Sequence, residues 1–231
     1  MIFGGFQKLT LLDYPGKVAC TVFTKGCNFR CPFCHNANLV NPDGQEQSIP
    51  SEEVLSYLRK RKGILEGICV SGGEPLLHDD LPDFLQEVKT LGYAVKLDTN
   101  GSFPDKLKEL AKSGLIDYVA MDIKNSLQKY PVTAGCETLK LDRINESIDF
   151  LMQSSLHYEF RTTVVEELHT ASDIKAIAKR IAGAQKYFLQ NFVDSGNIIE
   201  KNLHSVNEET LELMKSAAAE FVKPAKIRGK N

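Results

Sequence analysis

The sequence has no tryptophan, no long apolar run and no block of basic residues. A helix that spans a bilayer needs about 20 mostly apolar residues, so we expect no membrane span. The 28 Lys and Arg residues are balanced by 30 Asp and Glu residues, which gives a formal net charge of −2. A chain without a strongly basic face is not expected to bind nucleic acid or an anionic membrane.

The first residues also lack the basic segment and apolar core of a secretory signal. The chain nevertheless has six cysteines. Without export, cysteines indicate a reducing compartment and not a disulfide framework, so we expect a cytoplasmic protein. The length of 231 residues and the 42% hydrophobic content predict a globular protein with one domain over residues 1–231.

Three of the cysteines lie within eight residues, in the spacing C-x3-C-x2-C: Cys27, Cys31 and Cys34. A structural zinc ion takes four protein ligands, often from two distant C-x2-C pairs, and the chain has no second pair. His35 could complete a Cys3His zinc site, although its position next to Cys34 makes convergence awkward. A cubane iron–sulfur cluster needs four ligands, so three cysteines would leave one iron for a ligand that is not protein.

Short β-rich runs alternate with helical patterns along the chain. Strands are expected at 18–24, 67–71, 94–98, 118–123, 159–165 and 186–192, and helices at 51–62, 81–91, 104–113, 142–153, 172–182 and 208–221. A strand at 6–12 and a turn form an N-terminal extension over residues 1–17. Ser51 is expected to cap the first of these helices.

Six alternating units imply parallel strands joined by crossover helices. A complete eight-unit barrel takes about 250 residues, so the length favours an open, partial (β/α)6 barrel, with a doubly wound open sheet as the structural alternative.

Ligands of parallel α/β folds bind at the carboxyl ends of the strands, and polar or glycine-rich residues follow the expected strands here. They are Gly72, Gly73 and Glu74 after the second, Asp98, Thr99 and Asn100 at the third, Asp122 and Lys124 at the fourth, Arg161 in the fifth and Gln190 in the sixth. Each also has a plain structural reading. A Gly-Gly or Asn-Gly pair makes a turn, and an Asp/Lys pair makes a surface ion pair of small energetic value.

The cysteine spacing, with Phe33 before the last cysteine, resembles the radical S-adenosylmethionine (SAM) family. This resemblance implies that Cys27, Cys31 and Cys34 hold a [4Fe-4S] cluster whose fourth iron binds SAM. It also implies that the run from Gly72 to Glu74 binds the amino group of SAM and that Phe33 packs near the adenine. The partial barrel is the fold of that family.

Two further motifs resemble one branch of the family, the activating enzymes of glycyl radical enzymes. These motifs are Asp98-Thr99-Asn100-Gly101 and Asp122-x-Lys124. The resemblance implies that Asp98, Thr99 and Asp122 lie beside SAM or a monovalent cation and that Lys124 faces the SAM carboxylate. Asn100, Arg161 and Gln190 are further candidate SAM contacts.

The runs 11–17, 23–27 and 34–36 look similar to the activating proteins of anaerobic ribonucleoside-triphosphate reductase. The implied activity is reductive cleavage of SAM and formation of a glycyl radical on that reductase, with flavodoxin or ferredoxin as electron donor. The sequence departs from the family at one place. Residues 164–167 stand where the family has the G-x-I-x-G-x-x-E element of the fifth strand, so no residue is assigned to contact the adenine there. A radical SAM enzyme acting on a small molecule, such as a deazaguanine precursor, and a Cys3His zinc-binding interaction module are the alternatives.

Overall fold

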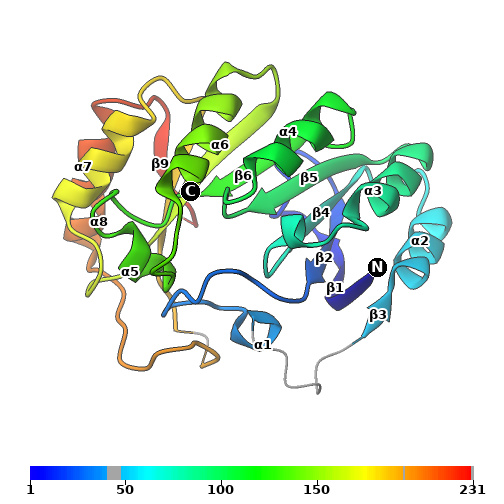
Figure 1. The fold of residues 1–231 in the computed structure, drawn as a ribbon, viewed down its shortest axis with the longest axis horizontal. Coiled ribbons are helices and arrows are strands. Elements are labelled where there is room, and N and C mark those ends of the chain that lie inside the picture. The colour runs from blue at the N-terminus through cyan, green and yellow to red at the C-terminus, as the bar shows by residue number, and fades with distance from the viewer. Residues whose placement is uncertain (41–47, 195, 230–231) are drawn as a thin grey trace. The chain divides into compact units, whose positions relative to one another are not determined.

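The structure is a computed structural model, and it describes residues 1–40, 48–194 and 196–229. Within these residues nine strands form one sheet (Figure 1). The strands are β1 (Ile2–Thr10), β2 (Ala19–Thr24), β3 (Ile49–Pro50), β4 (Gly67–Gly72), β5 (Ala94–Thr99), β6 (Tyr118–Asp122), β7 (His157–Val164), β8 (Tyr187–Asn191) and β9 (Ala225–Ile227). Their order in the sheet is β3-β1-β2-β4-β5-β6-β7-β8-β9.

Most of the sheet is parallel. β2 pairs in parallel with β4, and β4 with β5, while β7 pairs in parallel with β8 and β8 with β9. Only β1 makes antiparallel pairs, with β2 and with β3, among the pairings described. The outer strands β3 and β9 are not neighbours in the sheet order, so the sheet is open. The predicted open, partial (β/α) barrel is therefore confirmed.

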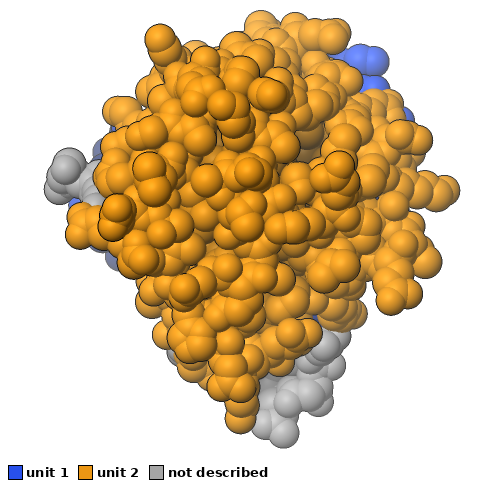
Figure 2. All heavy atoms as spheres, turned by 90° about the vertical axis from the view of Figure 1, so that its left-hand side faces the viewer, with its two compact units in different colours: residues 1–28, 38–99, 103–120 blue, residues 29–37, 100–102, 121–231 orange. Residues whose placement is uncertain are grey.

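The described chain forms two compact units, which Figure 2 distinguishes by colour. Unit 1 comprises residues 1–28, 38–99 and 103–120, and unit 2 comprises residues 29–37, 100–102 and 121–231. The single domain over residues 1–231, with an extension over 1–17, stays a prediction.

Unit 1 covers its strands with the helices α2 (Ser51–Lys60), α3 (Leu81–Thr90) and α4 (Pro104–Lys112). Each buries one apolar stripe, formed by Val54, Leu55 and Leu58 in α2, by Leu81, Phe84, Leu85 and Val88 in α3, and by Leu107 and Leu110 in α4. The expected cap of α2 is wrong by one residue. Pro50 is the N-cap, with extended backbone and no side-chain hydrogen bond, and Ser51 is the first helical residue.

Unit 2 contains the helices α5 (Tyr130–Ala134), α6 (Leu141–Gln153), α7 (Ala171–Arg180) and α8 (Glu208–Ala219). None of the helices that the structure describes in either unit is long and apolar enough to cross a membrane. α7 begins with a capping box: Thr170 Oγ1 accepts from the backbone N–H of Asp173, and the Asp173 carboxylate accepts from the backbone N–H of Thr170.

The long predicted elements are found within a few residues of their expected bounds. The elements that the periodicity did not predict are α1 (Ala37–Val40), β3, α5, β9 and the 3₁₀ turn η1 (Pro75–Leu77). Each spans five residues or fewer, which is too short for an apolar repeat to appear.

The Asp173 carboxylate makes the stability of unit 2 depend on pH. Burial alone would raise the pKa of Asp173, but hydrogen bonds from Lys129, Thr170 and Ser126 outweigh it and lower this pKa to about 2. Because the folded-state pKa lies below the unfolded value, the stabilisation is complete above about pH 4 and is lost as the pH falls toward 2. We expect Asp173→Asn to lower the free energy of unfolding by about 2 kcal/mol at pH 7, measured by urea unfolding.

Asp142→Asn is the matched control, because Asp142 is an exposed acidic residue in the first turn of α6. It should change the stability by less than about 0.5 kcal/mol. The difference between wild type and Asp173→Asn should shrink between pH 5 and pH 2. A difference that stays constant over this range would contradict the assignment.

Candidate functional site

The chain enters the cysteine loop at the end of β2. In unit 1 this part of the backbone contacts the glycine pair at the end of β4, Gly72 and Gly73. The Gly73 N–H donates to the Thr24 carbonyl at 3.0 Å, and the Glu74 N–H donates to the Gly26 carbonyl at 2.8 Å. A Cβ on Gly73 would lie 1.8 Å from the Gly26 oxygen, and one on Gly72 would lie 2.3 Å from the Thr24 nitrogen. Only glycine fits at these two positions, so the pair fixes the backbone that leads to Cys27.

The side chain of Glu74 supports the same turn from within unit 1. It is fully buried, and its Oε1 accepts from the Leu76 N–H at 3.1 Å and from the Thr99 hydroxyl at 2.8 Å. Two predicted site residues, Glu74 and Thr99, are thus brought together by a hydrogen bond. The predicted contact of residues 72–74 with the amino group of SAM stays a prediction.

The second part of the cysteine loop belongs to unit 2 and lies against the end of α5. The Arg30 N–H donates to the Ala134 carbonyl at 2.9 Å, and the Cys31 thiol donates to the same oxygen at 3.7 Å. Gly135 has φ +59, and a Cβ there would lie 2.1 Å from the Arg30 oxygen. The Cys34 N–H donates to the Cys31 carbonyl at 3.0 Å, so Cys31 and Cys34 lie at the two ends of one tight turn.

The two aromatic rings of the loop pack inside unit 2. Phe33 is buried, with its ring 6.4 Å from the His169 ring in an edge-to-face arrangement. The His35 ring stacks on Phe192 at 5.6 Å with an interplanar angle of 16°, so His35 has a packing role.

No group of three or more His, Cys, Asp or Glu side chains in the described part of the chain could hold a metal ion together.

The thiols of Cys31 and Cys34 lie in an apolar environment with a nearby lysine. Burial raises the pKa of Cys31 to about 11, against the opposing effect of the Lys124 ammonium. Burial likewise raises the pKa of Cys34, against a backbone hydrogen bond from Asn36 and the charge of Lys124. Such thiols keep their protons until a metal binds. Thiolates are the ligands of iron–sulfur clusters, so the chemistry of this donor set fits the cluster.

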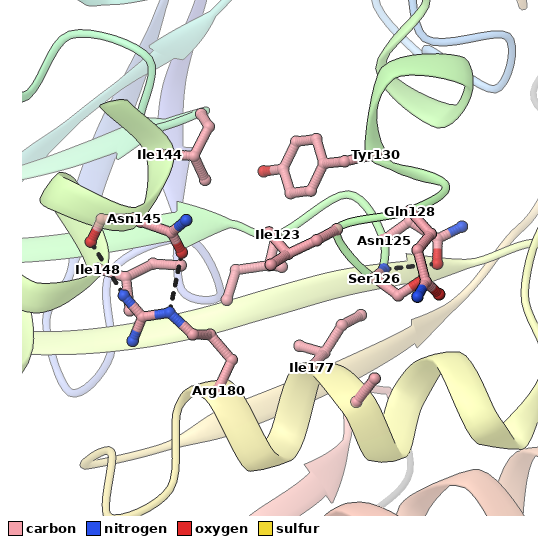
Figure 3. Close-up of a pocket in the computed structure, with 12 residues that line it drawn as sticks. Ile123, Asn125, Ser126, Gln128, Tyr130, Ile144, Asn145, Ile148, Ile177 and Arg180 are labelled. Carbon is pink, nitrogen blue, oxygen red and sulfur yellow. Dashed lines mark hydrogen bonds between the residues drawn. The ribbon is translucent and has the colours of Figure 1, made fainter. Parts of the chain in front are cut away.

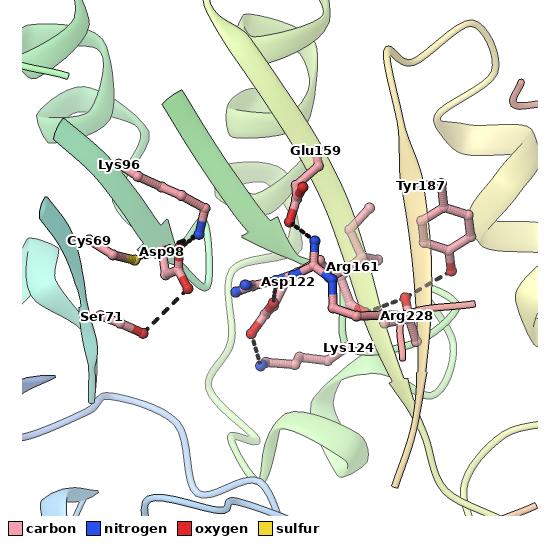
Figure 4. A network of polar contacts seen from close by, with 12 residues as sticks. Cys69, Ser71, Lys96, Asp98, Asp122, Lys124, Glu159, Arg161, Tyr187 and Arg228 are labelled. Atoms are coloured by element: carbon pink, nitrogen blue, oxygen red, sulfur yellow. Dashed lines mark hydrogen bonds and ion pairs between the residues drawn. The ribbon is translucent and has the colours of Figure 1, made fainter. Parts of the chain in front are cut away.

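A three-residue charge cluster in unit 2 contains Asp122, Lys124 and Arg161 (Figure 4). Arg161 Nε donates to Asp122 Oδ1 at 2.8 Å, and Lys124 Nζ donates to Asp122 Oδ2 at 3.0 Å. Burial would raise the pKa of Asp122, but Arg161 and Lys124 hold it well below its usual range. One carboxylate thus pairs with two cationic side chains, one on each of its oxygens. Asp122 is therefore an anionic partner of Arg161.

A second charge cluster, in unit 1, surrounds the predicted site residue Asp98 (Figure 4). The Lys96 ammonium forms an ion pair with Asp98 Oδ1. Ser71 Oγ donates to Asp98 Oδ2 at 3.4 Å, and the Cys69 thiol donates to Oδ1 at 3.6 Å. Lys96 and Cys69 are not among the residues that the sequence predicted for the site. The sequence does contain a feature that could have identified Lys96. It lies two residues before Asp98 in an apolar strand, and side chains two residues apart in a strand point to the same side.

Two other predicted site residues have structural contacts within unit 2. Asn100 is buried, and its Oδ1 accepts from the backbone N–H of Ser102 at 2.9 Å and from the Ser102 hydroxyl at 2.6 Å. Gln190 is half-buried on β8, opposite Thr163 of β7. A SAM contact of either residue stays a prediction.

Unit 2 also has a hollow of about 190 Å³ beside α6 and α7 (Figure 3). Its lining includes Ile123, Ile144, Ile148 and Ile177, and Arg180 lies at one side, where it donates to Asn145 Oδ1 at 2.8 Å. Small-molecule sites usually measure about 300–1,000 Å³ and carry convergent polar groups. This hollow is smaller than that range, so it is too small to be the SAM site.

The family model named Radical SAM superfamily matches residues 21–179 of this chain, which is more than half of it. The chain belongs to the radical SAM superfamily. The match begins in β2 and ends in α7, so it includes the cysteine loop and both charge clusters. Members of this family use a [4Fe-4S] cluster and SAM, and the chain is accordingly a radical SAM oxidoreductase. The zinc-binding interaction module is set aside.

The curated proteins that resemble this chain include an activating enzyme and a small-molecule enzyme. A Methanocaldococcus jannaschii protein assigned as a glycyl-radical enzyme activating enzyme is 32% identical over 234 residues, covering 98% of this chain and 95% of that protein. The 7-carboxy-7-deazaguanine synthase of Thermoplasma acidophilum is 29% identical over 183 residues, covering 74% of this chain and 82% of the synthase. The chain is thus similar to the activating branch over nearly its whole length.

Among solved structures, a domain of a pyruvate-formate lyase-activating enzyme from Bacteroides vulgatus superposes with a TM-score of 0.58. It is 20% identical, and the similarity covers 71% of this chain and 99% of that domain. At this level of identity the comparison shows the radical SAM fold.

The close contact between Gly135 and Arg30 predicts how unit 2 responds to an added methyl group. Gly135 and Gly114 have nearly the same conformation, with φ of +59 and +65, but a Cβ on Gly114 would meet nothing within 4 Å. Gly114→Ala should therefore cost only the left-handed strain of about 1 kcal/mol. Gly135→Ala should cost at least about 3 kcal/mol, because overpacking adds to that strain.

The free energy of unfolding in urea measures both changes. Equal losses for the two variants would show that the contact between residues 30 and 135 does not hold the loop of this radical SAM enzyme.

Proposed function

We propose that this radical SAM enzyme is an activating enzyme that generates a glycyl radical on an anaerobic ribonucleoside-triphosphate reductase. The observation that carries the proposal is the similarity to an assigned glycyl-radical activating enzyme over 95% of that protein's length. A whole-length match supports the same type of substrate better than a match confined to the shared fold. The resemblance of residues 11–17 and 23–27 to activating proteins of this reductase supports the choice of partner.

In this proposal Cys27, Cys31 and Cys34 hold the [4Fe-4S] cluster. When bound there, the cluster would supply one electron for the reductive cleavage of SAM to methionine and a 5′-deoxyadenosyl radical. The chain contributes the position of the thiolates, through the glycine-pair contact before Cys27 and the α5 contact at Cys31. A low-potential protein such as flavodoxin or ferredoxin delivers the electron.

The charge cluster of unit 2 is proposed to bind the carboxylate of SAM. Lys124 and Arg161 are the cationic side chains of this cluster and the proposed donors to that carboxylate. Asp122 orients both side chains and is itself kept ionised by them. Lys124 is the stronger candidate because its charge also acts on Cys31. The ammonium group of SAM is assigned to the carbonyls of Gly72 and Gly73.

Other side chains are proposed to shape the rest of the SAM site. Phe33 supplies an apolar surface near the adenine, and the residues Asp98, Thr99, Asn100 and Gln190 supply polar contacts at the strand ends. A radical must be protected from water and stray hydrogen donors until it reaches its substrate. The substrate hydrogen is proposed to come from a glycine Cα of the reductase.

A small-molecule reaction is the second candidate. The similarity to the 7-carboxy-7-deazaguanine synthase covers 82% of that enzyme, so a deazaguanine precursor is the specific alternative substrate. The two candidates share the cysteines and SAM and differ only in the hydrogen donor.

Mixing the protein with each candidate substrate separates these functions. The anaerobically purified protein, reduced with dithionite and supplied with SAM, should produce a glycyl-radical signal by electron paramagnetic resonance when the reductase is added. Replacing the reductase glycine by alanine should abolish the signal. Turnover of a deazaguanine precursor, with no signal on the reductase, would overturn the proposal and favour the second candidate.

Cys31→Ala and Cys136→Ala form a matched pair of variants. Cys136 lies outside the motif and is half-buried in unit 2. Cys31→Ala should lower radical formation by at least about a thousandfold, since the remaining two thiolates cannot hold the cluster, and Cys136→Ala should keep the wild-type rate. Loss of activity in both would point to a general sensitivity to cysteine replacement.

A further inference from the structure

Lys96 is a lysine whose side chain is buried in unit 1. Its side chain is 1% exposed and lies on β5 two residues before Asp98. A buried ammonium persists in a protein when a carboxylate and further hydrogen bonds compensate its lost hydration. Lys96 has both: it pairs with Asp98 Oδ1 and donates to Cys69 Sγ at 3.7 Å.

The Asp98 carboxylate is therefore already satisfied by side chains of its own unit. Oδ1 accepts from Lys96 and from the Cys69 thiol, and Oδ2 accepts from Ser71. The ion pair joins residues i and i+2 of one strand, whose side chains point to the same side. No movement of another element is needed to form it.

The monovalent cation expected beside Asp98 and Asp122 does not fit these side chains. A cation at Asp98 would lie next to the Lys96 ammonium, and like charges at that distance repel. Asp122, in unit 2, already faces Lys124 and Arg161, one on each carboxylate oxygen. Each aspartate is thus already paired with a cationic side chain of its own unit.

We infer that the Lys96 ammonium is a built-in counterion of Asp98, so that this enzyme needs no monovalent metal ion at that position. Lys96 is a positioning residue, since it acts through Asp98 and not through a contact with SAM. The inference rests on the Lys96–Asp98 pair and not on the choice of reductase as partner. Failure of the glycyl-radical experiment would leave it intact.

The wild-type protein gives the first test. The full chain, purified anaerobically, is compared in KCl and in tetramethylammonium chloride at equal ionic strength. The SAM dissociation constant should agree within about twofold, and the thermal midpoint should agree within about 2 °C. A larger dependence of either quantity on K⁺ would overturn the inference. The thermal midpoint does not depend on which residues bind SAM.

Lys96→Ala gives the second test, because it removes the ammonium and leaves room for an ion. In tetramethylammonium chloride the thermal midpoint should fall by roughly 10 °C. KCl should restore at least about half of this loss, since an ion that binds the folded state stabilises it. A loss that K⁺ does not restore would overturn the counterion role and leave Lys96 as a packing residue.

Lys106→Ala is the matched control, since Lys106 pairs with the exposed Asp79 in the same unit. Its midpoint should change by less than about 2 °C in either salt.

If Lys96→Ala does not fold, Lys96→Met and the double variant Lys96→Met/Asp98→Asn replace it. The double variant removes both charges and should melt at least about 5 °C above Lys96→Met, without K⁺ dependence. A double variant no more stable than Lys96→Met would contradict the pairing.

Discussion

The close approach of glycine backbone to the cysteine loop is the constraint on which the rest of the site depends. In unit 1, Gly72 and Gly73 lie directly against residues 24–26, and in unit 2 Gly135 lies against Arg30. Each contact is closed by backbone hydrogen bonds of 2.8–3.0 Å. The backbone on either side of the cysteines is therefore held by contacts that tolerate no side chain.

The electrostatics of the two units follow one principle. Asp98 and Asp122 are each compensated by lysine or arginine side chains of the same unit. The cluster around Asp122 contains two cationic side chains, Lys124 and Arg161, which suit an anionic group of a ligand, whereas Asp98 is paired with Lys96. These side chains hold one another in position, so the charges are organised by pairs within each unit.

The sequence predicts what depends on local spacing and misses what depends on contacts between distant segments. The long helices and strands follow from their apolar repeats, and the ion pair of Asp122 with Lys124 follows from strand alternation. The burial of Glu74 and the docking of Gly73 on Gly26 could not be predicted, because they join segments nearly 50 residues apart. Lys96 was missed because a single lysine in a strand normally indicates an exposed position.

The most direct test of the account is the iron content and visible spectrum of the anaerobically purified protein. A [4Fe-4S] cluster on three cysteines predicts a brown protein with about four irons per chain, and removing Cys27, Cys31 or Cys34 should abolish the colour. Cys136→Ala should retain it. A colourless wild-type protein that holds one zinc ion would contradict the account.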